Sequence, residues 1–179
     1  MSGYRANNNM HLSEIIGCKI SSDFSGFCIY DDTGKFSVWD SENSNVADYF
    51  WINGDFILNE KLFDLNYDKK LFAYIFFDKI IVYDFASKVS SSFDVPDKAF
   101  VFEVIFVGSD LFLLCDKFVL MVDFASDEVK KFNHPLNDAI ANIYSQSSGV
   151  VGAISYSGKA VFLDFDDGSW NDLFNFGCV

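Results

Sequence analysis

Few residues of this 179-residue chain have the types and spacing that catalysis requires. Its two histidines, His11 and His134, stand far apart, and neither lies in a local motif that pairs a histidine with a nucleophile. A general base must come within hydrogen-bond reach of the group it deprotonates. We therefore expect two exposed histidines, His11 in a flexible leader and His134 in the loop before Pro135, and no catalytic site.

The acidic stretch at residues 163–170, LDFDDGSW, comes nearest to a metal site. Asp164 and Asp166 stand two positions apart, as the first oxygen ligands of a calcium loop do. Gly168 comes one position too early for such a loop, and no glutamate follows at the twelfth position. The cysteines and histidines also lack the close pairing of zinc ligands. We expect a solvated turn here, and the sequence predicts neither a metal ion nor a cofactor.

The charge of the chain excludes further classes of function. It carries 13 Lys and Arg residues against 26 Asp and Glu residues, a formal net charge of −13. Proteins that bind DNA or RNA gain affinity by neutralising phosphates with basic side chains, so direct nucleic-acid binding is not expected. No apolar run reaches the ~20 residues of a membrane-spanning helix, and the N-terminal residues do not resemble a secretory signal. The four widely spaced cysteines indicate reduced thiols, so we expect a cytoplasmic or nuclear protein.

A repeat organises the elements that carry these residues. Four segments begin with Gly or Asp followed by Lys, continue with apolar residues and close on an aspartate. The closing aspartates are 44, 39 and 41 residues apart, and the second and third continue identically as Asp-Phe-Ala-Ser. The lysines are Lys35, Lys79, Lys117 and Lys159, and the aspartates are Asp40, Asp84, Asp123 and Asp164.

Each unit contains four short segments rich in Phe, Tyr, Val and Ile, which predict four β-strands. The second segment is apolar throughout, as in 71–77, whereas the fourth is more polar, as in 88–95. Stacked four-stranded blades bury both faces of their inner strands and expose the outer strand, so this polarity gradient favours radial stacking. We expect a leader at 1–12 and units near 13–54, 55–97, 98–138 and 139–179.

The unit length and the Trp39-Asp40 pair at the end of a third strand resemble the WD-repeat β-propellers. The other units close with Tyr83-Asp84, Val122-Asp123 and Leu163-Asp164, and the Gly-His dipeptide typical of these repeats is absent. The resemblance implies an all-β propeller of four blades, each with four antiparallel strands, that forms a partial or small ring. A two-sheet sandwich is the alternative, but it does not require an internal period near 41.

Two groups of residues are candidates for an interaction surface. The four lysines would stand at equivalent tight turns, either as ordinary turn residues or as a basic rim. Trp51 and Trp170 lie outside the predicted inner strands, so each is either an interface anchor or part of the packing between blades.

This resemblance, together with the lack of a catalytic constellation, predicts a non-catalytic scaffold that binds other proteins, for example an accessory subunit of an RNA-modifying or trafficking complex. One alternative is a hydrolytic enzyme that uses Asp32 or Asp166 at a central channel, and another is a truncated propeller without a retained role. Three arrangements of the four blades are possible. The blades close a small ring, another chain completes them to a larger ring, or the chain is a shortened form of a longer ancestor. Terminal blades expose apolar faces and strand edges, so we expect self-association or partner binding near residues 13–30 and 140–176.

Overall fold

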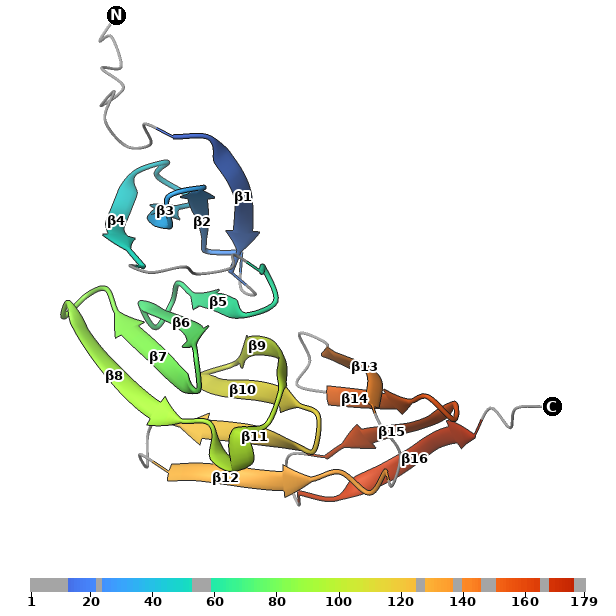
Figure 1. Ribbon diagram of the computed structural model, residues 1–179. Coiled ribbons are helices and arrows are strands. Elements are labelled where there is room, and N and C mark those ends of the chain that lie inside the picture. The colour runs from blue at the N-terminus through green and yellow to red at the C-terminus, as the bar shows by residue number, and fades with distance from the viewer. Residues whose placement is uncertain are drawn as a thin grey trace, which may run out of the picture.

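The computed structural model describes residues 13–21, 24–52, 59–124, 128–136, 140–145, 151–164 and 168–175. These residues form four separate antiparallel sheets, each of four strands in sequence order (Figure 1). The predicted all-β fold of four four-stranded units is therefore confirmed. In this part of the chain, no helix has the length and apolar character needed to cross a membrane.

The strands follow the predicted segments closely. The first sheet contains β1 (Ile15–Ile20), β2 (Gly26–Asp31), β3 (Lys35–Asp40) and β4 (Val46–Trp51), and the second contains β5 (Phe63–Asn66), β6 (Leu71–Phe76), β7 (Lys79–Asp84) and β8 (Val89–Asp94). After the short 3₁₀ helix η1 (Pro96–Lys98), the third contains β9 (Val101–Val107), β10 (Asp110–Cys115), β11 (Phe118–Asp123) and β12 (Glu128–Asn133). The fourth contains β13 (Ile140–Ser145), β14 (Val151–Ser155), β15 (Lys159–Leu163) and β16 (Trp170–Asn175).

The sheets follow one another as an open arc. The innermost strands of successive sheets are neighbours, with β1 beside β5, β5 beside β9 and β9 beside β13. Figure 1 shows the first and the fourth sheets at the two ends of this arc, well separated from each other. The described residues thus form a partial ring.

Turns with the same chemistry recur between the second and third strands. In the first sheet, Asp31 Oδ1 accepts a hydrogen bond of 3.1 Å from the backbone N–H of Lys35. In the fourth, Ser155 Oγ accepts one of 3.1 Å from the N–H of Lys159. The residue before each lysine is a glycine with a positive φ, +79° at Gly34 and +82° at Gly158. Glycine adopts this conformation without steric cost, which explains the repeated Gly-Lys pair in the sequence.

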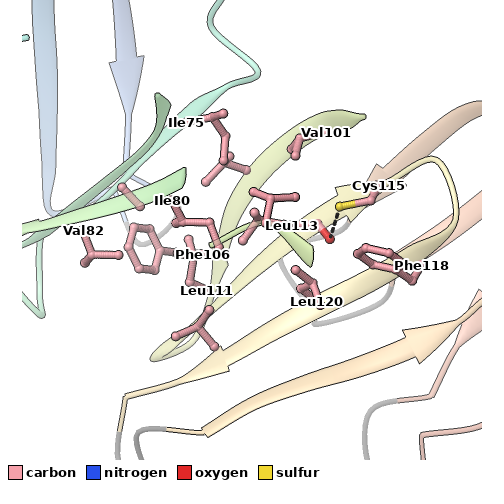
Figure 2. Packing of buried hydrophobic residues seen from close by; sticks show 14 residues of the cluster. Ile75, Ile80, Val82, Val101, Phe106, Leu111, Leu113, Cys115, Phe118 and Leu120 are labelled. Carbon is pink, nitrogen blue, oxygen red and sulfur yellow. Dashed lines mark hydrogen bonds between the residues drawn. The ribbon is translucent and has the colours of Figure 1, made fainter. Parts of the chain in front are cut away.

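Apolar side chains between neighbouring sheets form the core. Aromatic rings dominate between the first and second sheets, where Phe72 packs against Phe36 and Phe50 with ring centroids 5.0 and 4.9 Å apart. Aliphatic side chains fill the space between the second and third sheets (Figure 2). The repeat predicts equivalent, buried environments for Phe72 and Phe112, which stand near the start of the second strands of their units, and they are 0 % and 2 % exposed. The expected burial of both residues is confirmed.

Candidate interaction surfaces

The closing aspartates Asp40 and Asp84 hold the turns that follow the third strands. The Oδ1 atom of each accepts hydrogen bonds of 2.8 to 3.1 Å from the backbone N–H groups two and three residues further on. The residue four positions after the aspartate has a positive φ, +53° at Ser44 and +63° at Lys88. An Asx turn of this kind supplies acceptors to N–H groups that the strand ladder leaves unpaired.

The fourth sheet uses the same turn geometry. Gly168, four residues after Asp164, has φ +72°, and its N–H donates to Asp164 O at 2.9 Å. Asp123 ends β11, paired with Glu128 of β12. The rest of the turn after Asp123, residues 125–127, lies outside the described part of the chain, as do Asp166 and Asp167. For Asp40 and Asp84, the repeated aspartate is thus explained by the turn that its side chain holds.

The residues before the closing aspartates differ in their contacts. Trp39 is half-buried, stacks on Phe27 with centroids 6.0 Å apart, and donates from Nε1 to Ser37 Oγ at 2.9 Å. Tyr83 instead joins two sheets, because its hydroxyl donates to Asp48 Oδ2 of β4 at 2.9 Å. Burial and this hydrogen bond raise the pKa of Tyr83 to about 12, so it donates throughout the neutral range.

The four candidate lysines stand at the turns between the second and third strands of their sheets. Lys79 Nζ pairs with Asp94 Oδ1 at 2.9 Å, and Lys159 Nζ pairs with Asp172 Oδ1 at 3.2 Å. Lys117 is exposed. Pairing within the sheet provides a local reason for two of these residues, and their role as an interaction rim stays a prediction.

The first sheet has one face against the second sheet and one face without a neighbour. Cys28, Tyr30, Phe36 and Val38 face the second sheet and belong to the aromatic core. The residues that alternate with them point to the opposite side, since successive residues of a strand face opposite ways. At the end of the arc, no other described sheet covers this side. We call it the open face; its members are Ile15, Cys18, Ile20, Phe27, Ile29, Lys35, Ser37, Trp39, Tyr49 and Trp51.

The open face is largely apolar, and several of its apolar side chains are accessible to solvent. Ile20, Tyr49 and Trp51 are 58 %, 58 % and 53 % exposed. Tyr49 and Trp51 contact each other edge to face, with centroids 6.0 Å apart. Exposed aromatic and aliphatic side chains on a sheet face without a neighbour are typical of sites where another protein binds.

The two candidate tryptophans therefore have different surroundings. Trp51 lies on the open face, as an interface anchor would, whereas Trp170 packs with the residues between the third and fourth sheets. His134 stacks edge to face on Trp170, with ring centroids 6.4 Å apart, and its Nε2 lies 2.8 Å from Asp116 O. The expectation of an exposed loop histidine is wrong for His134, because this packing half-buries its ring. His11 lies outside the described residues.

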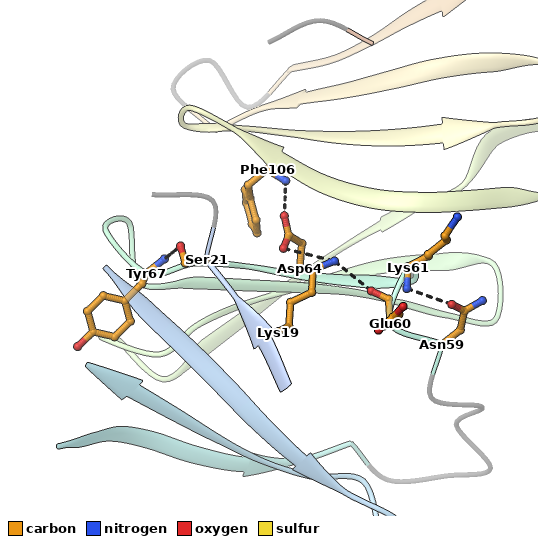
Figure 3. A network of polar contacts seen from close by, with 8 residues as sticks. All are labelled: Lys19, Ser21, Asn59, Glu60, Lys61, Asp64, Tyr67 and Phe106. Atoms are coloured by element: carbon orange, nitrogen blue, oxygen red, sulfur yellow. Dashed lines mark hydrogen bonds and ion pairs between the residues drawn. The ribbon is translucent and has the colours of Figure 1, made fainter. Parts of the chain in front are cut away.

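A buried carboxylate joins the inner strands of three sheets (Figure 3). Asp64 on β5 accepts a hydrogen bond of 2.7 Å from the backbone N–H of Phe106 on β9. Its other oxygen lies 3.7 Å from Nζ of Lys19 on β1, which also donates to Glu60 O at 3.0 Å. Burial raises the pKa of Asp64 to about 6, against the opposing effects of Lys19 and the hydrogen bond from Phe106.

Sequence reasoning missed Asp64, although a signal was present. It stands between Phe63 and Leu65 in a strand whose four residues are all buried, where an acid is unusual. Its bonds to β1 and β9 indicate that it helps to set the positions of three neighbouring sheets.

A cavity of about 370 Å³ opens where the segment before β5, the β6–β7 turn and the link from β8 to β9 meet. Leu62, Ile75 and Val101 form part of its apolar wall. Phe77 and Phe100 also line it, and their side chains are 87 % and 66 % exposed. The sequence reading placed Phe77 in the second strand; the structure places it in the turn, where its ring points to solvent.

The alternative of a hydrolytic site rests on two acids. Asp32 is exposed in the β2–β3 turn, and Asp166 lies outside the described residues. Over the part of the chain that the structure describes, no cluster of three or more His, Cys, Asp or Glu side chains has the arrangement of a metal site.

Solved structures of β-propellers resemble this fold. The WD40 repeats of RRP9 match with a TM-score of 0.61 at 15% sequence identity, over 92% of this chain and 52% of that one. The complex of the fission yeast SREBP-SCAP binding domains matches with a TM-score of 0.64 at 12% identity, over 96% and 50%. Dihydro-heme d1 dehydrogenase NirN in complex with DHE matches with a TM-score of 0.62 at 12% identity, over 93% and 37%.

These likenesses establish the fold. The resemblance to WD-repeat propellers is confirmed at this level, and the chain spans about half or less of the length of these solved structures. They include both WD40 domains and an enzyme, so the fold alone does not decide the activity. By sequence, no family model matches the chain and no curated protein is similar to it.

Proposed function

We propose that this chain is a non-catalytic scaffold of a larger intracellular assembly, and that it binds protein through the open face of its first sheet. The observation that carries the proposal is the exposure of Ile20 on β1 and of Tyr49 and Trp51 on β4, on a sheet face with no neighbour in the described structure. Tyrosine and tryptophan are the residues that most often dominate the energy of protein interfaces.

The packing inside the arc supports a protein sheet as the occupant. The side of the first sheet that faces the second is covered by rings and aliphatic groups, with Tyr30 and Phe36 edge to face against Phe63. The open face presents the same kind of residues on the same strands. A four-stranded sheet, from a second copy or from another protein, would bury these side chains as the second sheet buries the opposite side.

Charge favours protein over nucleic acid or lipid as the partner. The net charge of −13 repels phosphate groups, and the open face is largely apolar. Affinity at this surface would come from the burial of apolar area, at roughly 25 cal/mol for each Å². The partner surface would therefore be apolar in its centre.

The proposal also covers the class of assembly, the compartment and a second association surface. An accessory role in an RNA-modifying or trafficking complex, in the cytoplasm or nucleus, is supported by the propeller fold and by the binding-domain complex to which the chain is similar. Burial raises the pKa of Cys28 and of Cys115 to about 12, so both are neutral thiols at neutral pH. A second association surface near 140–176 belongs to the same proposal, and in the described part Ile154 and Phe162 are half-buried there.

Quantitative affinity purification of the tagged chain from its own cells tests this function. The comparison uses the wild type, the open-face variant Ile20→Lys/Trp51→Glu, and the control Val129→Glu, which changes an exposed apolar residue on the outer strand β12. We expect one stoichiometric partner with the wild type and the control, and its loss with the open-face variant. Equal recovery with all three would contradict a role of the open face.

A further inference from the structure

We propose that the cavity between the second and third sheets binds a short segment of a partner protein that carries an apolar side chain next to a basic residue. The proposal concerns a site separate from the open face and does not depend on it. It starts from Phe77 and Phe100, the two most exposed phenylalanines that line a cavity in the described structure.

The backbone at Phe77 suits a different residue. Its φ of +56° lies in the left-handed region, which glycine and asparagine adopt far more readily than phenylalanine. In the turns of the first and fourth sheets the residue with a positive φ is a glycine, Gly34 or Gly158, directly before the lysine, whereas Phe77 stands one position earlier in its turn. Fold stability therefore gives no reason for an exposed ring here, and a strained residue that offers a side chain to solvent is typical of a binding site.

Both rings are held in place before any ligand binds. The Phe77 ring contacts Phe76 edge to face, with centroids 4.6 Å apart, and the Phe100 ring contacts Phe102 in the same way at 5.2 Å. The backbone of Phe100 is fixed twice, since its N–H donates to Asp116 Oδ1 and its carbonyl accepts from Asp116 N, both at 3.0 Å. Rings fixed in this way lose little conformational entropy when they contact a ligand.

The walls of the cavity select the chemistry of the occupant. Leu62, Ile75 and Val101 offer an apolar interior, and a volume of about 370 Å³ has room for a large side chain and part of its backbone. Glu103 lies in the wall, half-buried, and burial raises its pKa. Lys61 also lines the cavity, and Lys61 and Lys19 both oppose this rise in the Glu103 pKa, so a basic ligand residue would compete with these lysines for the carboxylate. The net charge of −13 also attracts basic segments.

Three capped tripeptides test the site on the full chain by methyl NMR: acetyl-Lys-Phe-Lys-amide, acetyl-Glu-Phe-Glu-amide and acetyl-Lys-Ser-Lys-amide. We expect saturable shifts of the Ile75 and Val101 methyl signals with Lys-Phe-Lys, with a Kd of about 1 mM or tighter. Binding of the other two should be weaker by about tenfold or more, because each lacks one of the two recognised features. Toluene serves as a fourth probe.

Matched variants separate the aromatic contacts from the cavity itself. Phe77→Asn keeps a residue that tolerates the turn, Phe100→Ala removes the second ring, and Ala99→Leu fills the cavity while both rings stay. Each should weaken Lys-Phe-Lys binding at least fivefold, and Glu103→Gln should reduce its advantage over Glu-Phe-Glu. Tyr156→Ala, a control at the exposed β14–β15 turn, should leave binding unchanged.

Three results would overturn the proposal. They are the absence of saturable shifts with Lys-Phe-Lys, unchanged binding in all three cavity variants, and shifts with toluene but with none of the peptides. The last result would identify a site for a small apolar ligand. Because none of these variants alters the open face, failure here is distinguishable from failure of the proposed scaffold function.

Discussion

The ammonium nitrogen of Lys35 lies 5.1 Å from the centroid of the Trp51 ring and 5.9 Å from that of Tyr49. Lys35 and Trp51 are directly opposite each other on β3 and β4, so the cation and the two rings share the open face. Cation–π contacts of this kind orient exposed rings. The aromatic end of the open face is therefore an ordered surface that a partner meets in a fixed arrangement.

Removing a ring from the aromatic core should cost much of the stability of the fold. Phe72 is completely buried and contacts the rings of Phe36, Phe50 and Phe63. We expect Phe72→Ala to lower the free energy of unfolding by about 3 to 5 kcal/mol, and Phe112→Ala to have an effect of the same size. Urea unfolding followed by circular dichroism measures this change.

Phe77→Asn is the matched control for this prediction. Its ring is exposed and asparagine tolerates the left-handed turn, so this change should not lower the free energy of unfolding by more than about 0.5 kcal/mol. If Phe72→Ala were as stable as this control, the assignment of Phe72 to the core would be wrong.

Asp64 should make stability depend on pH. Its pKa is about 6 in the folded chain and about 3.9 in an unfolded one, so folding favours the protonated form. The stabilisation of the folded chain by protonated Asp64 is fully present below pH ~4 and is lost as the pH rises through ~6. In Asp64→Asn the contribution is absent, so the stability of the variant relative to wild type should rise by about 2 to 3 kcal/mol between pH 4 and pH 7.

Unfolding midpoints at several pH values for both proteins supply the measurement. Asp94→Asn removes an exposed carboxylate on the outer strand β8 and serves as the control. A difference between Asp64→Asn and wild type that stays constant across this pH range would show that Asp64 is not buried in a folded molecule.

Asp84 should stabilise the turn after β7 through its acceptors. Hydrogen bonds from the Ser87 side chain and backbone lower the pKa of Asp84. Its contribution to the stability of the fold is therefore present at pH values above the usual pKa of a carboxyl group, and it is lost as the pH falls through the pKa of the folded chain. We expect Asp84→Ala to cost about 0.5 to 2 kcal/mol, as the loss of a helix cap does. Asp84→Asn keeps an acceptor oxygen and should cost less, and thermal unfolding at pH 7 compares the two.

The turn lysines give a prediction about the surface. Lys79 and Lys159 are already paired within their own sheets. Replacing both, together with Lys117, by Ala should leave partner recovery in affinity purification unchanged. Loss of the partner from this triple variant would establish the basic rim as a binding surface.

The fold was predictable because its signals are local and repeated. The Gly-Lys turns follow from the positive φ of Gly34 and Gly158, and the closing aspartates follow from the turns that they cap. The region 13–30 was expected to contribute to association, and Ile20 lies on the open face within it. Trp51 was a candidate anchor, whereas Tyr49 was not predicted.

Other features depend on contacts between sheets that a linear pattern does not contain. The hydrogen bond from Phe106 to Asp64 joins residues 42 positions apart. The sequence pattern places Phe77 in an apolar strand. It lies in the turn instead, and that position depends on the register of β6 with β7, which the pattern does not contain. The backbone of Phe100, just before β9, is fixed by a hydrogen bond to Asp116, just after β10, which lies 16 positions away in the sequence.

Sedimentation equilibrium at low micromolar concentration tests the open face most directly, on the purified wild type and on Ile20→Lys/Trp51→Glu. We expect the wild type to self-associate and the double variant to be monomeric with an unchanged circular dichroism spectrum, while the control Val129→Glu behaves as the wild type. A wild type that sediments as a monomer and unfolds cooperatively would contradict self-association through this face.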